Sequence, residues 1–142
     1  APAFTPDAPN NTKAIVTRTK MKIEFQEDKD IITITTPKNN QVIFNDEEGS
    51  IKLADSNSNT ITMSSSGIEI KSASAVTIKA ATELNMSATS GGSCKVSGGD
   101  LSMEALNVSC NGQVTFKAQG AASAQLTASG EVKVQGAMVM IN

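Results

Sequence analysis

The chain has 142 residues, a formal net charge of −2, and no histidine, tryptophan or tyrosine. Without histidine it lacks the commonest general base and metal ligand, and its balanced charge provides no basic patch for a nucleic-acid backbone. Only 3% of the residues are aromatic and 39% are hydrophobic, so large side chains are too few to fill a compact core well. This composition favours a thin, repetitive structure, and we expect no catalytic site, metal, cofactor or nucleic-acid partner.

The first 20 residues are predicted to form an extended lead-in, and residues 21–142 to form the structured domain. Pro2, Pro6 and Pro9 fall within the first nine positions, and proline is unfavourable in helix interiors and in central strands. The longest apolar run, at residues 137–141, is far shorter than the roughly 20 residues that cross a bilayer. The sequence therefore predicts neither a signal peptide nor a membrane span.

From residue 23 to residue 141, apolar residues recur as fifteen pairs in which one residue, usually polar or small, separates two apolar ones. Short strands with one buried face and one solvated face have this alternation, so we expect an all-β fold. The pairs follow at intervals of 9 or 10 residues as far as residue 61 and of about eight residues afterwards. The candidate core residues, all members of these pairs, are Ile23, Phe25, Ile32, Ile34, Ile51, Leu53, Ile61, Met63, Ile68, Ile70, Val76, Ile78, Leu84, Met86, Val114, Phe116, Val132 and Val134.

The connections between the early pairs carry residues that favour turns. Residues 27–30, 37–40, 46–50 and 55–59 are rich in Asp, Asn, Pro or Gly, whereas the later connections shrink to Ser, Ala and Gly. Asp28 and Asp30 lie in one of these turns without the remaining ligands of a calcium-binding loop. We interpret such acidic pairs as turn residues.

Three architectures agree with this pattern. A β-sandwich has short strands at a similar spacing, but two modest inward side chains per strand would fill its core poorly. A single-chain β-solenoid would use roughly three strands per coil and would reach only about five coils. We favour a homotrimeric, intertwined triple-stranded β-helix, a needle-like prism in which each chain contributes one strand to every triangular layer.

The two cysteines are expected to be reduced. Cys94 and Cys110 both lie on the inward side of the alternation, 16 residues or about two layers apart. Two layers span roughly 10 Å, which exceeds the limit of about 7 Å between the Cα atoms of a disulfide. We expect two buried thiols that pack as small hydrophobic residues.

The end of the chain is predicted to be a partner-binding tip. In a threefold rod the last residues of three copies gather into one apolar end face, and an exposed apolar patch usually marks an interaction site. By alternation, Val139 and Ile141 face inward, and Met138 and Met140 face outward or lie on the rim. The candidate tip residues are Gly136, Ala137, Met138, Val139, Met140, Ile141 and Asn142.

Three runs of the chain resemble the needle domain of VgrG proteins, the spikes of type VI secretion and related phage-tail-like contractile injection systems. They are TRTKMKIEFQEDKDIITITTP at residues 17–37, IKLADSNSNTITMSSSGIEIKS at residues 51–72, and VQGAMVMIN at residues 134–142. The resemblance implies a homotrimeric, intertwined β-helix that pierces a target-cell envelope without catalysis, and a blunt tip that docks a PAAR-repeat protein or an effector. It also implies assembly in the bacterial cytoplasm, injection out of the producing cell, and upstream spike domains to which residues 1–20 would connect.

Two other functions remain open. A trimeric fibre or adhesin-like binding module would share the rod but would need an aromatic or polar recognition face. A single-chain β-solenoid enzyme would need a cluster of acids in one groove, and residues 71–142 contain only four acidic residues.

Overall fold

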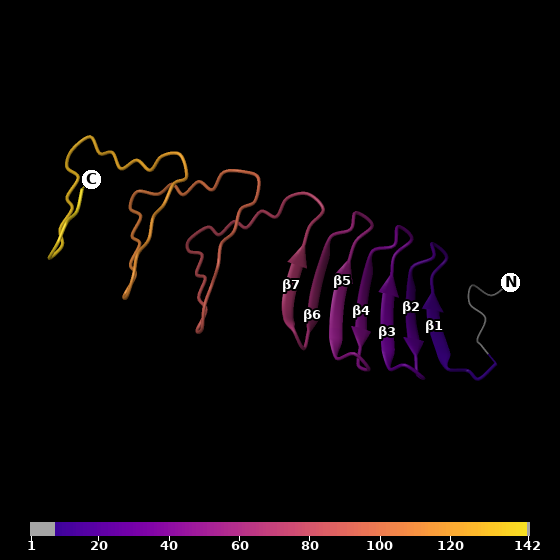
Figure 1. The fold of residues 1–142 in the computed structure, drawn as a ribbon. Helices are drawn as coiled ribbons and strands as arrows, with labels where there is room; N and C mark the ends of the chain where they lie inside the picture. Colours follow the sequence, from indigo (N-terminus) through magenta and orange to yellow (C-terminus); the bar gives the residue numbers. More distant parts are fainter. Residues whose placement is uncertain (1–7, 142) are drawn as a thin grey trace. The chain divides into compact units, whose positions relative to one another are not determined.

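The computed structural model describes residues 8–141, which contain seven β-strands and no helix. The strands are β1 (Thr12–Val16), β2 (Lys22–Gln26), β3 (Ile31–Thr35), β4 (Gln41–Asn45), β5 (Ser50–Ala54), β6 (Thr60–Ser64) and β7 (Gly67–Lys71) (Figure 1). They form one sheet in which each strand pairs antiparallel with the next along the chain. The prediction of an all-β fold is therefore confirmed. The described chain contains no helix of the length and apolarity needed to cross a membrane.

The sheet is built from a repeated hairpin of 19 residues. β1, β3 and β5 begin at residues 12, 31 and 50, and β2, β4 and β6 begin at residues 22, 41 and 60. The alternating intervals of 9 and 10 residues between apolar pairs are the two halves of this repeat. The repeat ends at β7, because Ser64 pairs directly with Gly67 and a two-residue turn replaces the longer loop. Gly67 has a φ of 120°, a conformation that favours glycine.

Three of the loops that connect neighbouring strands lie at the same end of the strands, and each is closed by the same kind of hydrogen bond. Thr17 begins the β1–β2 loop, Thr36 the β3–β4 loop and Asp55 the β5–β6 loop. In each loop the side-chain oxygen of this first residue accepts a hydrogen bond from the backbone N–H four residues later, at distances of 3.1, 3.1 and 2.9 Å. Side chains that hydrogen-bond to the nearby backbone favour turns over continued strands. Such loops fix the pairing register, and with it the face on which each side chain lies.

One face of the sheet carries two continuous rows of apolar side chains, which we call the apolar face. Register places the members of each row opposite one another on neighbouring strands. The first row contains Ile15, Ile23, Ile34, Val42, Leu53, Ile61 and Ile70. The second row contains Phe25, Ile32, Phe44, Ile51, Met63 and Ile68. The middle row of the opposite face is mostly polar or charged and contains Ala14, Glu24, Thr33, Ile43, Lys52, Thr62 and Glu69.

After Lys71 the described chain contains no strand. Extended segments alternate with bends that recur about every eight residues, for example at residues 73–74, 81–82, 89–90, 113–114, 121–122 and 129–130. The single chain therefore forms strands only as far as Lys71, and the pairing of the later segments between copies stays a prediction. The apolar alternation continues, but a strand also needs a neighbouring backbone, and none of these segments finds one within residues 72–141.

The ladder from β1 to β7 also differs from the expected intertwining. Both edges of β2 to β6 are occupied by strands of the same chain, so no strand of another copy fits between them. An intertwined arrangement is thus possible only where the chain leaves its own backbone unpaired, after Lys71.

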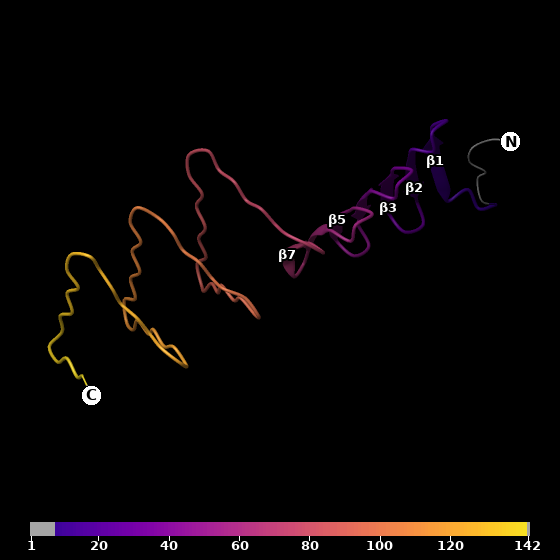
Figure 2. The same ribbon diagram turned by 90° about the horizontal axis from the view of Figure 1, so that it is seen from above.

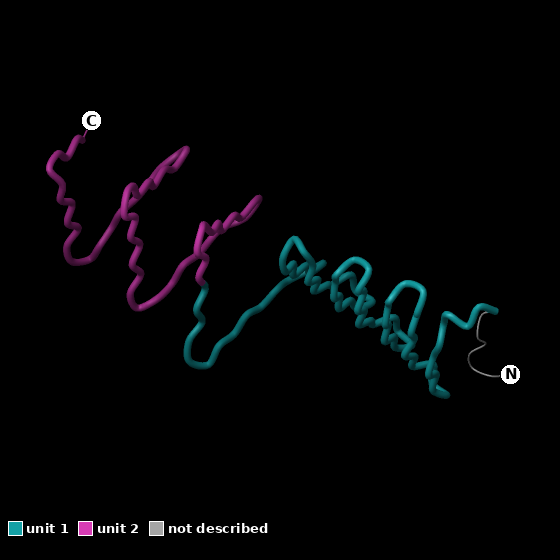
Figure 3. The backbone as a smooth tube through the Cα atoms, turned by 90° about the horizontal axis from the view of Figure 1, so that it is seen from below, with its two compact units in different colours: residues 1–86 teal, residues 87–142 magenta. Residues whose placement is uncertain are grey.

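The chain divides into two compact units, Ala1–Met86 and Ser87–Asn142 (Figure 3). The first contains the whole sheet, which is a single layer in the views of Figures 1 and 2. β1 lies within the predicted lead-in, where it pairs with β2. The extended segments and bends begin in the first unit, after Lys71, and make up the whole described part of the second unit, where they run in wide open turns (Figure 2). No residue among 8–141 is buried in either unit, so the single chain has no hydrophobic core.

Candidate interaction face

The apolar face is largely uncovered in the single chain, where its side chains are exposed or half-buried and none is buried. On the inner strands, Ile32, Phe44 and Leu53 keep 38–40% of their surface exposed, because only strand neighbours cover them. At the outer strands the exposure rises to 64% for Ile15 and 72% for Ile68. Monomeric soluble proteins rarely expose contiguous apolar surface of this extent, so the face marks an interaction site.

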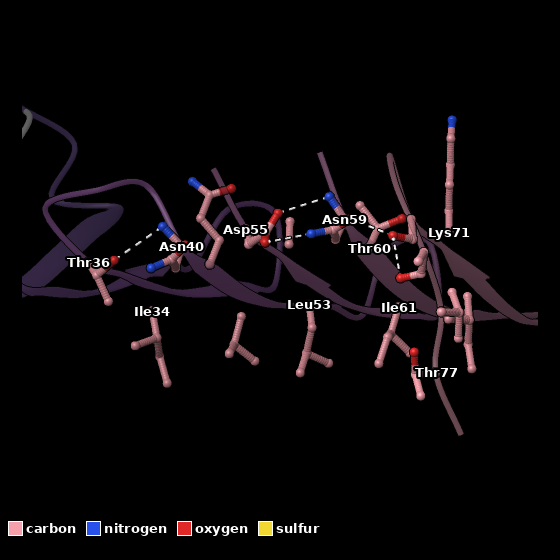
Figure 4. A pocket seen from close by; sticks show the side chains of 17 residues that line it. Ile34, Thr36, Asn40, Leu53, Asp55, Asn59, Thr60, Ile61, Lys71 and Thr77 are labelled. Atoms are coloured by element: carbon pink, nitrogen blue, oxygen red, sulfur yellow. Dashed lines mark hydrogen bonds between the residues drawn. The ribbon is translucent and has the colours of Figure 1, made fainter. Parts of the chain in front are cut away.

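A groove of about 620 Å³ follows the first row of the apolar face. Figure 4 shows Ile34, Leu53 and Ile61 pointing to the same side of the sheet, from β3, β5 and β6. Val76 and Thr77 also line the groove, so the segment after β7 crosses the apolar face beside the last strands. The groove is open, and the aliphatic side chains of the first row along it suit other aliphatic side chains.

A network of polar side chains lies at the end of this groove nearest to the β5–β6 loop. The Asp55 carboxylate accepts hydrogen bonds from the backbone N–H groups of Asn57 and Asn59, both at 2.9 Å, and from the side-chain amides of the same residues at 3.1 and 2.8 Å. The backbone N–H of Asn59, followed by the side-chain amides of Asn59 and Asn57, lowers the pKa of Asp55 from an ordinary 3.8 to about 2. The ionised carboxylate therefore holds the β5–β6 loop closed.

Asn59 connects this loop to the chain that leaves the sheet. Its side-chain oxygen accepts hydrogen bonds from the Ser72 hydroxyl and from the Ala73 backbone N–H, each at 3.0 Å. The Ser72 hydroxyl also lies 3.2 Å from the Ala75 carbonyl oxygen. The network thus sets the direction in which the chain continues after β7.

The opposite face carries the partly buried ion pair of the sheet. Lys22 Nζ lies 2.6 Å from a Glu24 carboxylate oxygen, and the Gln26 amide donates to the other oxygen at 3.1 Å. The hydrogen bond from Lys22 is the main cause that lowers the pKa of Glu24, although partial burial opposes it. These satisfied polar groups are suited to face solvent, in contrast to the apolar face.

The candidate core residues fall into two groups in the structure. Those from Ile23 to Ile70 lie together on the apolar face. The remaining eight lie where no strand forms, and all of them are exposed: Val76, Ile78, Leu84, Met86, Val114, Phe116, Val132 and Val134. Ile15 was not predicted as a member of the face, because it falls in the proline-rich lead-in. The signal that identifies it is the 19-residue spacing to Ile34 and then to Leu53.

The candidate tip and the cysteines are exposed in the single chain. Met138, Met140 and Ile141 each expose at least 80% of their surface, and Asn142 lies outside the described residues. Cys94 and Cys110 are free thiols and are exposed in the single chain, so their burial in the trimer stays a prediction. Within residues 8–141, no three His, Cys, Asp or Glu side chains come together as metal ligands would.

A single-layer sheet with one uncovered apolar face defines a structural module that is completed by self-association. Residues 31–114 match the family described as the phage baseplate V C-terminal trimerisation domain, which is more than half of the chain. The chain belongs to this family. Membership supports a structural component of the phage-tail spike type that associates as a homotrimer. No curated protein matches the chain significantly.

Proposed function

We propose that the chain is the needle of a trimeric spike in a VgrG-like contractile injection system, and that it pierces a target-cell envelope mechanically. The observation that carries this proposal is the apolar face. One apolar row crosses all seven strands and a second crosses β2 to β7, and most of this face is uncovered in the described chain, so a rigid rod results only when copies bury these rows against one another. Family membership sets the number of copies at three.

The two parts of the chain would assemble differently. From β1 to β7 the backbone hydrogen bonds are made within the chain, so three sheets would meet only through side chains, as the three sides of a prism. After Lys71 the backbone groups have no partner strand in the described chain, and buried N–H and C=O groups need partners. An intertwined triple-stranded β-helix would supply these partners from the other two copies. Bends about every eight residues support this arrangement, because each copy would add one side to every triangular layer.

Such a needle would resist unfolding kinetically as well as thermodynamically. An intertwined chain cannot leave the rod without breaking its hydrogen bonds to both neighbours, which raises the barrier to unfolding. We propose that this rigidity is the activity of the protein, that it acts without catalysis, and that it is assembled in the bacterial cytoplasm before injection.

We further propose that residues 136–142 form a tip that docks a PAAR-repeat protein or an effector. The exposed Met138 and Met140 support this assignment, because methionine is flexible and adapts to a partner surface. The test is binding of a purified PAAR-repeat protein to the wild type and to the double variant Met138→Ser/Met140→Ser. We expect at least a tenfold loss of affinity with unchanged molar mass, whereas Gln135→Ser should bind normally. Equal binding by all three proteins would remove the tip assignment.

The piercing function is tested on contractile particles isolated from producing cells. Particles whose spike carries a substitution that prevents trimer formation should no longer admit a membrane-impermeant dye into target cells, while wild-type particles should. Dye entry at the wild-type rate would contradict a mechanical role of the needle.

A further inference from the structure

Residues 72–80 have the length and the sequence of one more loop and strand. A loop over residues 72–76, directly after β7, would have the same length as the β1–β2, β3–β4 and β5–β6 loops. The Thr-Ile that follows at residues 77–78 repeats the Thr-Ile with which β6 begins. An eighth strand in the register of β5 and β6 would place Lys79 opposite Glu69, and oppositely charged residues stabilise neighbouring strands.

The described chain nevertheless does not form this strand. Residues 75–80 make no hydrogen bond to another described backbone group, and β7 pairs only with β6. In the three earlier loops the fourth residue, which is Lys20, Asn39 or Ser58, has a φ of 66°, 61° or 67°. Ala75 at the same place has no positive φ. The segment after β7 therefore begins like the earlier loops but does not turn back.

The first residue of this segment uses its side chain differently. In each of the three earlier loops, the first side chain accepts a hydrogen bond from the backbone N–H four residues later, which closes the loop. The Ser72 hydroxyl instead accepts from the N–H of Ser74, only two residues later, at 3.2 Å. It also donates to the side-chain oxygen of Asn59 at 3.0 Å. Ser72 is thus bonded to the preceding loop and not to the far end of its own.

An asparagine at the last position of a loop also binds the backbone of the next loop. Asn40 accepts a hydrogen bond from the N–H of Ser56 at 3.3 Å, and Asn59 accepts one from the N–H of Ala73 at 3.0 Å. Figure 4 shows Asn40 and Asn59 in line along the loops. This backbone contact alone does not divert the chain, because the β5–β6 loop makes it and still leads into β6.

The additional contact at Ser72 follows from residue type. Asp55, whose preceding loop ends in Asn40, is an ionised carboxylate and has no proton to donate. Thr36 has a hydroxyl, but its preceding loop ends in Met21, whose side chain has no oxygen. Among the first residues of these loops, the Ser72 hydroxyl is therefore the one that meets an amide oxygen of the preceding loop.

We propose that the contact between Asn59 and Ser72 ends the intrachain ladder at β7, because it keeps Ser72 from closing a fourth loop that would lead to an eighth strand. Asn59 and Ser72 are positioning residues that determine where the chain stops pairing with itself. The inference goes beyond the proposed trimer and does not need a second copy, because every contact that carries it lies within one chain.

A transfer of loop-closing residues tests this assignment. Ser72→Asp removes the hydroxyl and supplies an acceptor, and Val76→Asn supplies its amide partner, as in the β5–β6 loop. The reporter for an eighth strand is the pair Glu69→Cys/Lys79→Cys, in a background with the native cysteines replaced by Cys94→Ser and Cys110→Ser. Directly opposite residues of antiparallel strands lie about 4.5–5.5 Å apart, within disulfide range.

Equilibration with glutathione measures the effective concentration of the two reporter thiols within one chain. We expect Ser72→Asp/Val76→Asn to raise it at least about tenfold over the native loop, because the new hydrogen bonds hold the loop closed. Links between copies run at multiples of 14.7 kDa on a non-reducing gel and are counted separately.

The matched control is Ala73→Ser/Ser74→Asn/Ala75→Ser in the same reporter background. It gives the three inner residues of the segment the sequence of residues 56–58 but leaves Ser72 in place. Its effective concentration should stay within about twofold of the native loop. Ser72→Thr keeps the hydroxyl and should behave like the control. Circular dichroism of each variant shows whether the sheet is retained, and the single variant Ser72→Asp replaces the double variant if the latter loses it.

The outcomes separate this inference from the proposed function. A rise confined to the variants that carry Ser72→Asp supports the assignment. An unchanged effective concentration in those variants, or an equal rise in the control, overturns it. Light scattering tests the trimer independently, because a native mass of 14.7 kDa would remove the trimer and leave the comparison of loops intact.

Discussion

Leu53 on β5 provides a quantitative test of the apolar face. It lies in the first apolar row between Val42 and Ile61, and 40% of its surface is exposed in the single chain. Full burial of a leucine side chain contributes about 1.5–3 kcal/mol, so covering the exposed 40% contributes roughly 0.6–1.2 kcal/mol per copy. Three copies bring the contribution to roughly 2–4 kcal/mol per trimer, and every 1.4 kcal/mol changes an equilibrium constant about tenfold.

We therefore expect Leu53→Ser to weaken trimer formation by roughly 25- to 700-fold. Light scattering over a dilution series measures the trimer–monomer equilibrium. The matched control is Lys52→Ser, the neighbouring residue in the same strand, whose side chain lies on the opposite face. It introduces the same residue into the same strand and should leave the equilibrium within about twofold. Equal effects of the two substitutions would refute burial of the apolar face between copies.

Two further perturbations test other parts of the structure. Ile68→Asp would place three carboxylates on the apolar faces that meet in the trimer, so we expect no trimer to form, and an SDS-resistant trimer of this variant would contradict the assignment. The lowered pKa of Asp55 makes a pH-dependent contribution to the stability of the folded chain. This contribution is complete at pH values above 3.8, the ordinary pKa of the carboxyl group. It is lost as the pH falls toward about 2, because the unfolded chain takes up the proton at a higher pH than the folded chain does. Chemical denaturation between pH 5 and pH 2 should show this loss of stability in the wild type and a smaller loss in Asp55→Asn, because asparagine keeps an oxygen acceptor but has no charge. Identical pH profiles of the two proteins would contradict the role of the carboxylate.

Much of the sheet could be predicted from the sequence, because alternation and turn chemistry are local signals. The pairs Ile23/Phe25 and Ile32/Ile34 and those that follow as far as residue 70 coincide with β2 to β7. The turn-forming residues 55–59 close a hairpin as expected, although nothing in the pattern indicated that Asn59 would also reach Ser72 and Ala73.

The limits of prediction also have physical causes. Alternation shows which side of a segment is apolar, but it contains no information on whether the neighbouring strand belongs to the same chain or to another. The same alternation therefore occurs in strands that pair within the chain, as far as β7, and in the segments after Lys71 that find no partner strand in it. β1 has only one large apolar side chain on the apolar face, Ile15, which pairs in register with Ile23. It forms no i, i+2 apolar pair of its own, so the alternation that identifies the other strands does not identify β1.

The central claim is that copies of this chain bury their apolar faces in a homotrimer. The most direct measurement is the molar mass of the wild-type chain in solution, by light scattering behind a sizing column. We predict a mass of about three times 14.7 kDa, near 44 kDa. A stable species of 14.7 kDa would leave the apolar face of a monomer in water and would contradict the account.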